Sequence, residues 1–284
     1  MTNVNKNLKP DKLSEFTSQN NAEKKATLNC RCDHSFKELV FEYKEPPEGE
    51  TDFGFSKNEY YRNSQKCSSC NHYFSFNNMD MDNFYQDRYV NSTYGGFIHE
   101  KFKKIISLPR NKSDNYWRVK RLSEYIKEFF KDTKKNNLLD IGSGLGIFPY
   151  AMKKAGFLCT ALDPDPKAAK HIREELKIDT IEGDLFKIKT NKKFNIATLN
   201  KVLEHVYDPV KMLKKTSEFV ENGGLIYIEL PDGEIASKYG KNREEFFIEH
   251  HHVFSFNSLL LMAESANLIP LKIERINELK VILK

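Results

Sequence analysis

From Asn137 onward, short apolar runs alternate with segments whose apolar residues recur at helical spacing. The apolar runs have the length of buried strands and cover residues 138–141, 157–162, 194–199 and 225–230. The amphipathic segments between them cover residues 147–155, 166–176 and 209–220. Strands that alternate with helices along the chain are typical of a parallel sheet with helices on both faces. The pattern therefore predicts an α/β fold with a doubly wound, mostly parallel sheet.

The chain after Pro231 adds a helix and two strands to this prediction. Apolar spacing predicts the helix at residues 256–266, and the strands follow near residues 271–276 and 279–283. Only a short connection separates the two strands, so we expect them to pair antiparallel. This hairpin is predicted to lie at the edge of the sheet.

The chain before Asn137 lacks this alternation. Residues 1–26 are rich in Asn, Lys, Ser and Glu without periodicity, which predicts a disordered tail. Residues 27–80 hold little continuous apolar sequence, so we expect a small, loop-rich module that needs a cross-link or a bound metal to be stable. Residues 81–136 are predicted to form a helical connector or lid. The helix near residues 116–130 is expected to bury a stripe made of Trp117, Leu122, Tyr125, Ile126 and Phe129.

Composition and charge narrow the functional classes. The 284 residues have room for one large domain and a smaller one. The 45 basic and 40 acidic residues give a net charge of +5, which is too balanced to favour nucleic acid as a partner. No apolar run approaches the roughly 18 residues of a membrane span, and the N-terminus lacks the apolar core of a secretory signal. We therefore expect a cytoplasmic protein.

The sequence LLDIGSGLGIF at residues 138–148 contains a glycine turn directly after the first predicted strand. Ligands of doubly wound sheets bind at the carboxyl ends of the strands, so this turn marks the expected cofactor site. Gly142, Gly144 and Gly146 have the spacing G-x-G-x-G, whereas dinucleotide-binding turns have G-x-G-x-x-G. Asp140 precedes the turn, and its carboxylate would suit a cationic ligand better than a pyrophosphate.

The residues Asp140-Ile-Gly-Ser-Gly-Leu-Gly146 resemble the first motif of class I S-adenosylmethionine-dependent methyltransferases. The resemblance implies the seven-stranded methyltransferase sheet, with its domain at roughly residues 137–284. It also implies that Gly142 and Gly144, together with Gly146, let the backbone approach the amino-acid end of S-adenosylmethionine. Asp140 would then face the ammonium or sulfonium side of the cofactor.

Further landmarks of the same family follow in the expected order. Asp163 ends the second strand in ALDPDP, where a carboxylate would accept both ribose hydroxyls, although it could instead cap the next helix. Asp184 and Leu185 in EGDL match the family's adenine-contacting position, although Asp184 could be a turn residue. Asn200 ends the fourth strand before EHVYDP, a segment common in these enzymes, and could contact the cofactor or cap a helix.

Four of the five cysteines form two close pairs, Cys30 with Cys32 and Cys67 with Cys70. In a reducing compartment, paired cysteines of this kind favour a tetrahedral, structural zinc over disulfides. His34 and His72 lie near enough in sequence to replace a cysteine as ligand, and four unliganded thiols are the alternative. The fifth cysteine, Cys159, lies in a predicted strand and is expected in the core.

A cysteine-liganded module ahead of this domain resembles the zinc-binding region of methyltransferases that act on nucleotide-linked deoxysugars and other surface-carbohydrate precursors. The segments at residues 84–89 and 113–118 correspond to a stretch that covers cofactor or substrate in such enzymes. The sugar C-methyltransferases carry a further C-terminal domain, and these 284 residues are not expected to include one. The resemblance therefore implies carbohydrate biosynthesis, with O-methylation or another small acceptor left open.

Histidines provide the candidate chemistry, because a hydroxyl acceptor must lose its proton as it takes the methyl group. His205 follows the fourth strand, and the triplet at residues 250–252 lies after the fifth, on the same rim of the sheet. Alternation would point His250 and His252 to one side and His251 to the other. The catalytic candidates are His205 and His250, the latter because the resemblance places a Glu-His pair in the acceptor pocket. Packing roles, or a second metal ion at the triplet, are the alternatives.

The favoured function is methyl transfer from S-adenosylmethionine to a small, sugar-like acceptor, most simply a hydroxyl. One alternative is an RNA methyltransferase whose zinc module grips nucleic acid, although residues 27–80 lack a basic and aromatic stripe. Another is a catalytically inactive protein that binds the cofactor within a larger assembly. The glycine spacing disfavours a dehydrogenase.

Overall fold

The computed structural model describes residues 28, 37–56, 58–77, 79, 97–130, 136–276 and 278–284. The predictions for the tail, for Cys30 and Cys32, and for residues 81–96 lie outside these residues. Among the described helices, none combines the length and apolar character needed to cross a bilayer.

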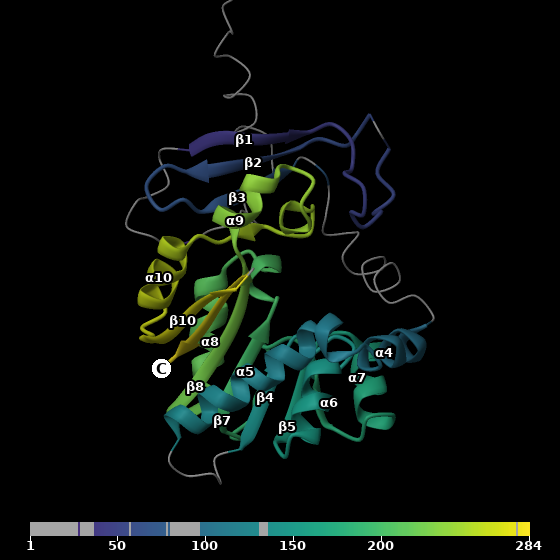
Figure 1. The fold of residues 1–284 in the computed structure, drawn as a ribbon, viewed down its shortest axis with the longest axis vertical. Coiled ribbons are helices and arrows are strands. Elements are labelled where there is room, and N and C mark those ends of the chain that lie inside the picture. The colour runs from purple at the N-terminus through teal and green to yellow at the C-terminus, as the bar shows by residue number, and fades with distance from the viewer. Residues whose placement is uncertain are drawn as a thin grey trace, which may run out of the picture.

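A seven-stranded sheet forms the larger part of the molecule, in the order β10-β11-β8-β7-β4-β5-β6 (Figure 1). Its strands are β4 (Asn137–Ile141), β5 (Leu158–Asp163), β6 (Asp179–Glu182), β7 (Phe194–Asn200), β8 (Val220–Pro231), β10 (Pro270–Ile276) and β11 (Glu278–Leu283). Strands β4 to β8 pair parallel, whereas β11 pairs antiparallel with β8 and with β10. The predicted fold class, including the antiparallel edge hairpin, is confirmed.

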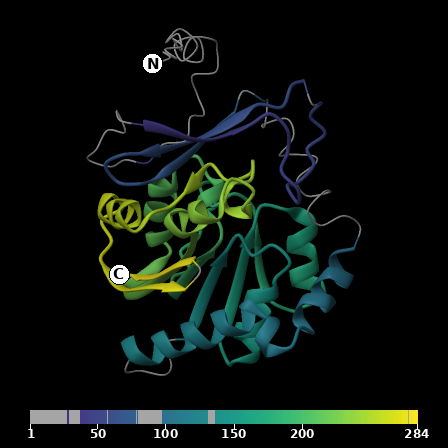
Figure 2. The same cartoon turned by 45° about the horizontal axis from the view of Figure 1, so that its top comes forward.

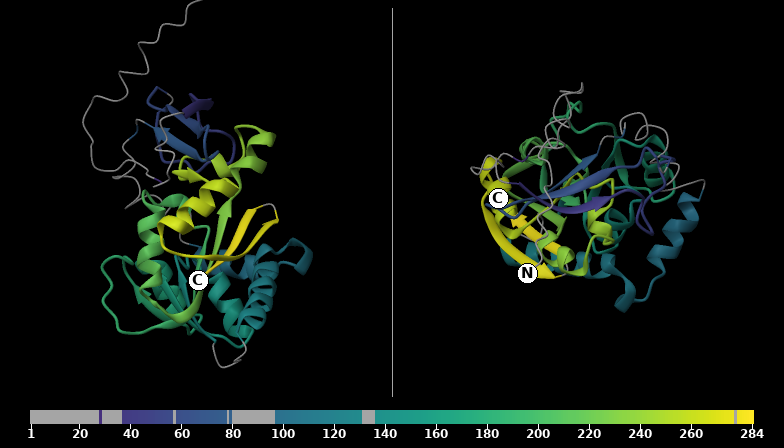
Figure 3. Two further views of the ribbon diagram at one scale, coloured as in Figure 1. Left: turned by 90° about the vertical axis from the view of Figure 1, so that its left-hand side faces the viewer. Right: turned by 90° about the horizontal axis from the view of Figure 1, so that it is seen from above.

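Helices cover both faces of this sheet (Figure 3). They are α4 (Ile98–Ile106), α5 (Asp114–Phe129), α6 (Ile147–Lys154), α7 (Pro166–Glu174), α8 (Pro209–Ser217) and α10 (Phe256–Ser265). Leu138 of β4 packs in one core cluster with α4, α5, α6 and α7, whereas Leu139 packs in another with α8 and α10. Successive residues of a strand face opposite sides of a sheet, so one apolar run supplies both cores.

Local sequence explains where these helices begin. Asp165 and Asp208 cap α7 and α8 by accepting the backbone N–H of Lys167 and Lys211, and a proline follows each cap. Proline suits the first helical position because no partner exists there for its missing N–H. Ser255 begins α10 with a reciprocal capping box.

Helix α5 forms as predicted, but one member of its predicted buried stripe does not. Leu122, Tyr125 and Ile126 are buried against the sheet. Trp117 lies in the first turn of the helix with 47% of its surface exposed, and its ring contacts Tyr116 and the Lys120 ammonium instead of the core. The prediction for Trp117 was wrong because Trp117 lies about 140° around the helix from Leu122, and Arg118 and Arg121 face the sheet in this part of α5.

A second, four-stranded sheet lies beyond the carboxyl end of β8 (Figures 1 and 2). Its strands in spatial order are β1 (Lys37–Tyr43), β2 (Arg62–Cys67), β3 (Tyr73–Asn77) and β9 (His252–Val253). Where the sequence predicted a loop-rich module, the structure therefore has an antiparallel sheet. The module pairs with β9 and buries Tyr43 and Tyr73 beside Phe246 and Ile248, so its core includes apolar residues from a distant loop.

Candidate functional site

The glycine turn joins the end of β4 to α6 through three residues in the left-handed region. Their φ angles are +70° at Gly142, +52° at Gly144 and +71° at Gly146. A Cβ at Gly142 would lie 2.7 Å from a methyl of Val202, and one at Gly146 would lie 2.7 Å from a methyl of Leu176. Both conformation and space therefore require glycine here.

Asp140 is buried directly beside this turn, at the center of the parallel sheet. One oxygen, Oδ1, accepts hydrogen bonds from Thr198 Oγ1 at 2.6 Å and Asn200 Nδ2 at 3.1 Å. Burial raises the pKa of Asp140 to about 6, against the lowering effect of these hydrogen bonds and of Arg118. Asn200 Oδ1 is also buried and has no hydrogen-bond partner. The strand ends thus present a carboxylate and an amide oxygen, which suit a cationic ligand.

Asp163, at the end of β5, binds the glycine turn itself. Its Oδ2 accepts the N–H of Gly144 at 2.7 Å, and its Oδ1 accepts the N–H of Asp165 at 2.9 Å. Burial raises the pKa of Asp163 to about 6. Because Asp165 caps α7, Asp163 does not have the helix-capping role that was its alternative. Asp140, Asn200 and Asp163 therefore lie near one another at the carboxyl ends of β4, β7 and β5.

Asp184 and Leu185 follow β6, one strand farther along the sheet. Asp184 Oδ1 accepts the N–H of Phe186 at 2.9 Å, and Oδ2 lies 3.8 Å from the Lys187 ammonium. Leu185 is buried in the core cluster of α8 and α10. The turn geometry proposed as the alternative for Asp184 is present, and it leaves the residue partly exposed.

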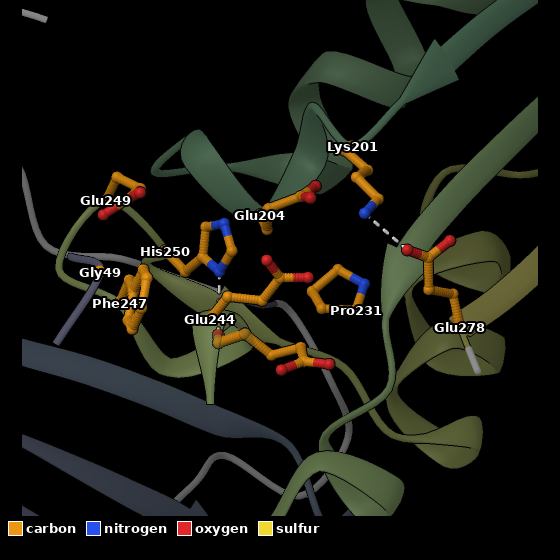
Figure 4. Close-up of a pocket in the computed structure, with 10 residues that line it drawn as sticks. Gly49, Lys201, Glu204, Pro231, Glu244, Phe247, Glu249, His250 and Glu278 are labelled. Atoms are coloured by element: carbon orange, nitrogen blue, oxygen red, sulfur yellow. Dashed lines mark hydrogen bonds and ion pairs between the residues drawn. The ribbon is translucent and has the colours of Figure 1, made fainter. Parts of the chain in front are cut away.

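A cavity of about 290 Å³ opens beside the carboxyl ends of β7 and β8 (Figure 4). Its ionisable lining consists of Lys201, His250 and the glutamates Glu204, Glu244, Glu245, Glu249 and Glu278. Lys201 stands in the left-handed region, with φ at +56°, and its ammonium lies 2.6 Å from Glu278. Glu204 is 1% exposed, its Oε2 has no hydrogen-bond partner, and burial raises its pKa to about 8. Carboxyl groups therefore dominate this cavity.

His205 and His250 meet beside Glu204, with ring centroids 4.7 Å apart in an edge-to-face arrangement. His205 Nδ1 lies 3.0 Å from the carbonyl oxygen of Glu249, and His250 Nδ1 lies 2.9 Å from that of Glu245. Burial lowers the pKa of His205 to about 4 and that of His250 well below its usual range. The two predicted catalytic histidines thus come together from η2 (Leu203–His205) and from the loop before β9.

The other two histidines of the triplet have different neighbours. His251 stacks on Tyr207 with centroids 4.3 Å apart, and His252 Nδ1 lies 2.9 Å from Nε2 of His72. The predicted alternation, with His250 and His252 on one side, was wrong because only His252 belongs to a strand.

The second sheet holds the histidine loop through a buried ion pair that the sequence did not reveal. Arg62 is fully buried, and its Nη1 donates to the carbonyl of Phe246 at 2.6 Å while Nη2 lies 2.5 Å from Glu50. Glu50 Oε1 also accepts the N–H of Ile248 at 2.8 Å. The pair therefore fixes the backbone on both sides of Phe247. Neither residue lies in a recognisable motif, so no local signal could have indicated the contact.

A second buried charge cluster attaches α5 to the sheet. Glu229 of β8 pairs with Arg118 at 2.6 Å, with Arg121 at 3.4 Å and with Lys280 at 3.5 Å. Arg118 and Lys280 hold the pKa of Glu229 at about 2, despite its burial. Arg118 of this cluster also lowers the pKa of Asp140, although burial outweighs that effect. The sequence analysis missed this cluster.

Cys67 ends β2 and Cys70 lies in the tight turn that follows, and both are buried. The turn is closed by Asn71, whose N–H donates to the Cys67 carbonyl at 2.8 Å. Burial, together with the neighbouring Cys67 thiol, raises the pKa of Cys70 to about 11. Two thiols on one turn fit half of a tetrahedral zinc site. His72 contacts Ser258 and His252 through its two ring nitrogens, and Cys159 is buried in β5 as expected.

Known proteins with similar sequences are methyltransferases. The ubiquinone biosynthesis O-methyltransferase of Histophilus somni is 28% identical over 143 residues, which cover 45% of this chain and 60% of that protein. The enzyme of the same name from Actinobacillus pleuropneumoniae serotype 7 is 33% identical over 116 residues, covering 37% and 49%. The chain thus matches less than two thirds of the length of these relatives.

Solved structures show the same fold at low sequence identity. An S-adenosylmethionine-dependent methyltransferase from Clostridium acetobutylicum has a TM-score of 0.52 at 14% identity, covering 65% of this chain and 98% of its own. Magnesium protoporphyrin IX methyltransferase from Synechocystis, with bound SAH, has a TM-score of 0.52 at 11% identity, covering 71% and 99%.

A family model described as a methyltransferase domain matches residues 115–272, from α5 into β10. The matched range contains the glycine turn, Asp140, Asp163 and the histidine loop, and it makes up more than half of the chain. The protein belongs to this methyltransferase family.

Proposed function

We propose that the chain is an S-adenosylmethionine-dependent methyltransferase that methylates a hydroxyl of a small, sugar-like acceptor. A nucleotide-linked sugar or surface-polysaccharide precursor in the cytoplasm is the proposed substrate class. The observation that carries the proposal is the buried Asp140 carboxylate beside three left-handed glycines at the carboxyl end of β4. A cationic sulfonium donor fits that position, whereas a pyrophosphate does not.

The proposed cofactor contacts surround the glycine turn. They are Asp140, Gly142, Gly144, Gly146, Asp163, Asp184, Leu185 and Asn200. An ionised carboxylate offers about four acceptor sites, and backbone N–H groups occupy one on each oxygen of Asp163. The Asp163 carboxylate can therefore still accept the two ribose hydroxyls that we assign to it.

The proposed acceptor site is the acidic cavity beside β7 and β8. The acceptor oxygen attacks the methyl carbon, the C–O bond forms as the C–S bond breaks, and the electron pair stays on sulfur. Alignment of the two reactants supplies much of the catalysis, because the sulfonium is already activated. We assign removal of the hydroxyl proton to His205 and His250, of which His250 lines the cavity.

The character of the cavity supports a polyhydroxylated acceptor. Its apolar side chains are Pro231 and Phe247, and the remaining side chains that line it are ionisable. Sugar hydroxyls can donate to such carboxylates, whereas an apolar quinone precursor would leave them desolvated without partners. Methylation of a quinone precursor, the activity for which the relatives are named, is the second candidate function.

We also propose a structural zinc held by Cys67 and Cys70 together with Cys30 and Cys32. Such a closed site would contribute to folding and not to catalysis. Metal analysis of the Cys67→Ser variant should show one zinc fewer per chain than the wild type. Equal zinc contents would contradict this ligand set.

Calorimetry followed by a transfer assay tests the main proposal. We expect the purified chain to bind S-adenosylmethionine and to transfer labelled methyl to a member of a nucleotide-sugar panel. Label only in quinone precursors would favour the second candidate, and label only in RNA would favour an RNA methyltransferase. Cofactor binding without turnover on any panel would indicate an inactive partner protein. Binding of NAD without binding of S-adenosylmethionine would overturn the cofactor assignment.

A further inference from the structure

Three side chains that the cofactor site does not use converge at the wall of the acidic cavity. Glu204, His205 and His250 each bring one ligand atom into a group whose members lie within 4.8 Å of one another. Two come from η2 and the third from the loop before β9. Figure 4 shows Glu204 and His250 on the same wall of the cavity.

The hydrogen bonds of the two imidazoles fix the atoms that face the group. A backbone carbonyl only accepts, so Nδ1 of His205 and Nδ1 of His250 each carry a proton toward Glu249 O and Glu245 O. In each neutral ring, Nε2 then holds the lone pair. Metal-binding histidines are oriented in this way, with the other ring nitrogen donating to a carbonyl or carboxylate.

The third candidate ligand is the carboxyl group of Glu204, one oxygen of which has no hydrogen-bond partner. Glu204 is 1% exposed, and its Oε2 makes no hydrogen bond. A buried oxygen without a partner is costly, which indicates that a ligand normally completes it. Among the described residues that line the cavity, Lys201 is the lysine, and its ammonium lies 2.6 Å from Glu278. Carboxylates therefore outnumber the cations that could compensate them.

The backbone holds the two segments together. The N–H of His251 donates to the Glu204 carbonyl at 2.8 Å, and the Glu249 carbonyl accepts from the His205 ring. Tetrahedral zinc with bonds of about 2.1 Å requires ligand atoms about 3.4 Å apart. Since the ligand atoms lie within 4.8 Å of one another, the widest separation must contract by at most about 1.4 Å, which side-chain rotation can provide.

We propose that Glu204, His205 and His250 form a zinc site with one open coordination position. Two imidazoles and one carboxylate are a ligand set of catalytic zinc, whose fourth position is free for water or substrate. This site is separate from the four-cysteine site, and its three ligands all lie at the acceptor cavity.

The role of the ion rests on the proposed function. The acceptor hydroxyl takes the open position, and zinc lowers its pKa so that the proton leaves to solvent water. The oxygen then attacks the methyl carbon, the C–O bond forms, the C–S bond breaks and the electron pair remains on sulfur. With the ion bound, His205 and His250 therefore promote proton loss as its ligands, and solvent water takes the proton that the imidazoles themselves would accept without the ion.

Cobalt titration of the full chain, after metal removal by chelation, tests the site with Co²⁺ as the probe. Cysteine ligands give a thiolate-to-cobalt band in the near ultraviolet, whereas a Glu/His site gives only visible bands. We expect a Co²⁺ class without thiolate character in the wild type. Glu204→Gln and His250→Gln should each weaken it by about 100-fold or more. The matched control Glu244→Gln changes another carboxyl of the same cavity and should leave it unchanged.

Thermal unfolding and S-adenosylmethionine affinity of each variant show whether it is folded. Equal Co²⁺ uptake and affinity in the wild type and both folded variants would overturn the zinc site. The metal titration uses neither donor nor acceptor, so its failure leaves the proposed methyl transfer standing. Failure to bind S-adenosylmethionine would overturn the proposed function but not the metal site.

Discussion

The two sides of the proposed active site are built in different ways. The cofactor side comes from consecutive βα units, so Asp140, the glycine turn, Asp163 and Asn200 lie within one stretch of the sheet domain. The acceptor side joins Gly49, the turn after β7, the histidine loop and Glu278 of β11. A site made from consecutive units has a local sequence signature, whereas a site assembled from distant segments depends on tertiary contacts.

The largest expected effect comes from a substitution that changes the acceptor side and leaves the cofactor side intact. His250→Gln should lower turnover by about 10²–10⁴-fold, because proton removal from the acceptor is lost. S-adenosylmethionine affinity should stay near that of the wild type, since the histidine is not among the proposed cofactor contacts. His251→Gln, in the same loop but stacked on Tyr207, should keep most of the turnover. Steady-state kinetics with calorimetry measure both quantities, and an equal loss in the two variants would contradict the assignment.

The next largest effect is expected at the ion pair that holds the histidine loop. Arg62→Met leaves the Glu50 carboxylate buried without its partner, which should lower the free energy of unfolding by about 3–5 kcal/mol. The double variant with Glu50→Gln should recover part of this loss because no unpaired charge remains. Urea unfolding of the wild type, the two single variants and the double variant measures the coupling free energy between Arg62 and Glu50. Additive single effects would show that the pair does not act as a unit.

Asp140→Asn is the corresponding substitution on the cofactor side. Burial raises the pKa of Asp140 to about 6, so its ionisation destabilises the folded chain at pH 8. The amide should therefore raise the free energy of unfolding by on the order of 1–3 kcal/mol. It should also weaken S-adenosylmethionine binding, because the negative charge that faces the cation is gone. Thermal unfolding and calorimetry should move in opposite directions, and equal cofactor affinity would contradict the role of Asp140.

The smallest expected effect is the pH dependence of cofactor binding. Asp140 and Asp163 both have pKa values raised to about 6, mainly by burial. Below pH 6 both become protonated, so affinity for the cationic donor should fall by about tenfold per pH unit for each group that must be ionised. The stability of the unliganded chain should change the other way, because its cost of ionisation is present above pH 6 and is relieved as pH falls toward 4. Calorimetry from pH 5 to 8 tests the first expectation, and a flat profile would contradict it.

Most of the sheet domain was predictable from the sequence. The apolar runs predicted β4, β5, β7, β8 and the edge hairpin, whereas the short strand β6 had no predicted run. Helical spacing predicted α5, α6, α7, α8 and α10. The polar residues at the strand ends pointed to Asp140, Asp163 and Asn200. Each of these signals lies within a few residues of the feature that it predicts. The exception was Trp117, which was assigned to the buried face although Arg118 and Arg121 occupy the side of α5 that contacts the sheet.

The sequence alone determined the order of strands and helices, the glycine turn and the chemistry of the groups beside it. Backbone conformation and alternating burial act over short stretches and therefore leave a local pattern. Only the tertiary structure decided that β9 joins β3, that Arg62 and Glu50 hold the histidine loop, and that Glu204, His205 and His250 meet. Those contacts join residues that are far apart in the chain, and pairing between distant segments is set by the packing of the whole molecule.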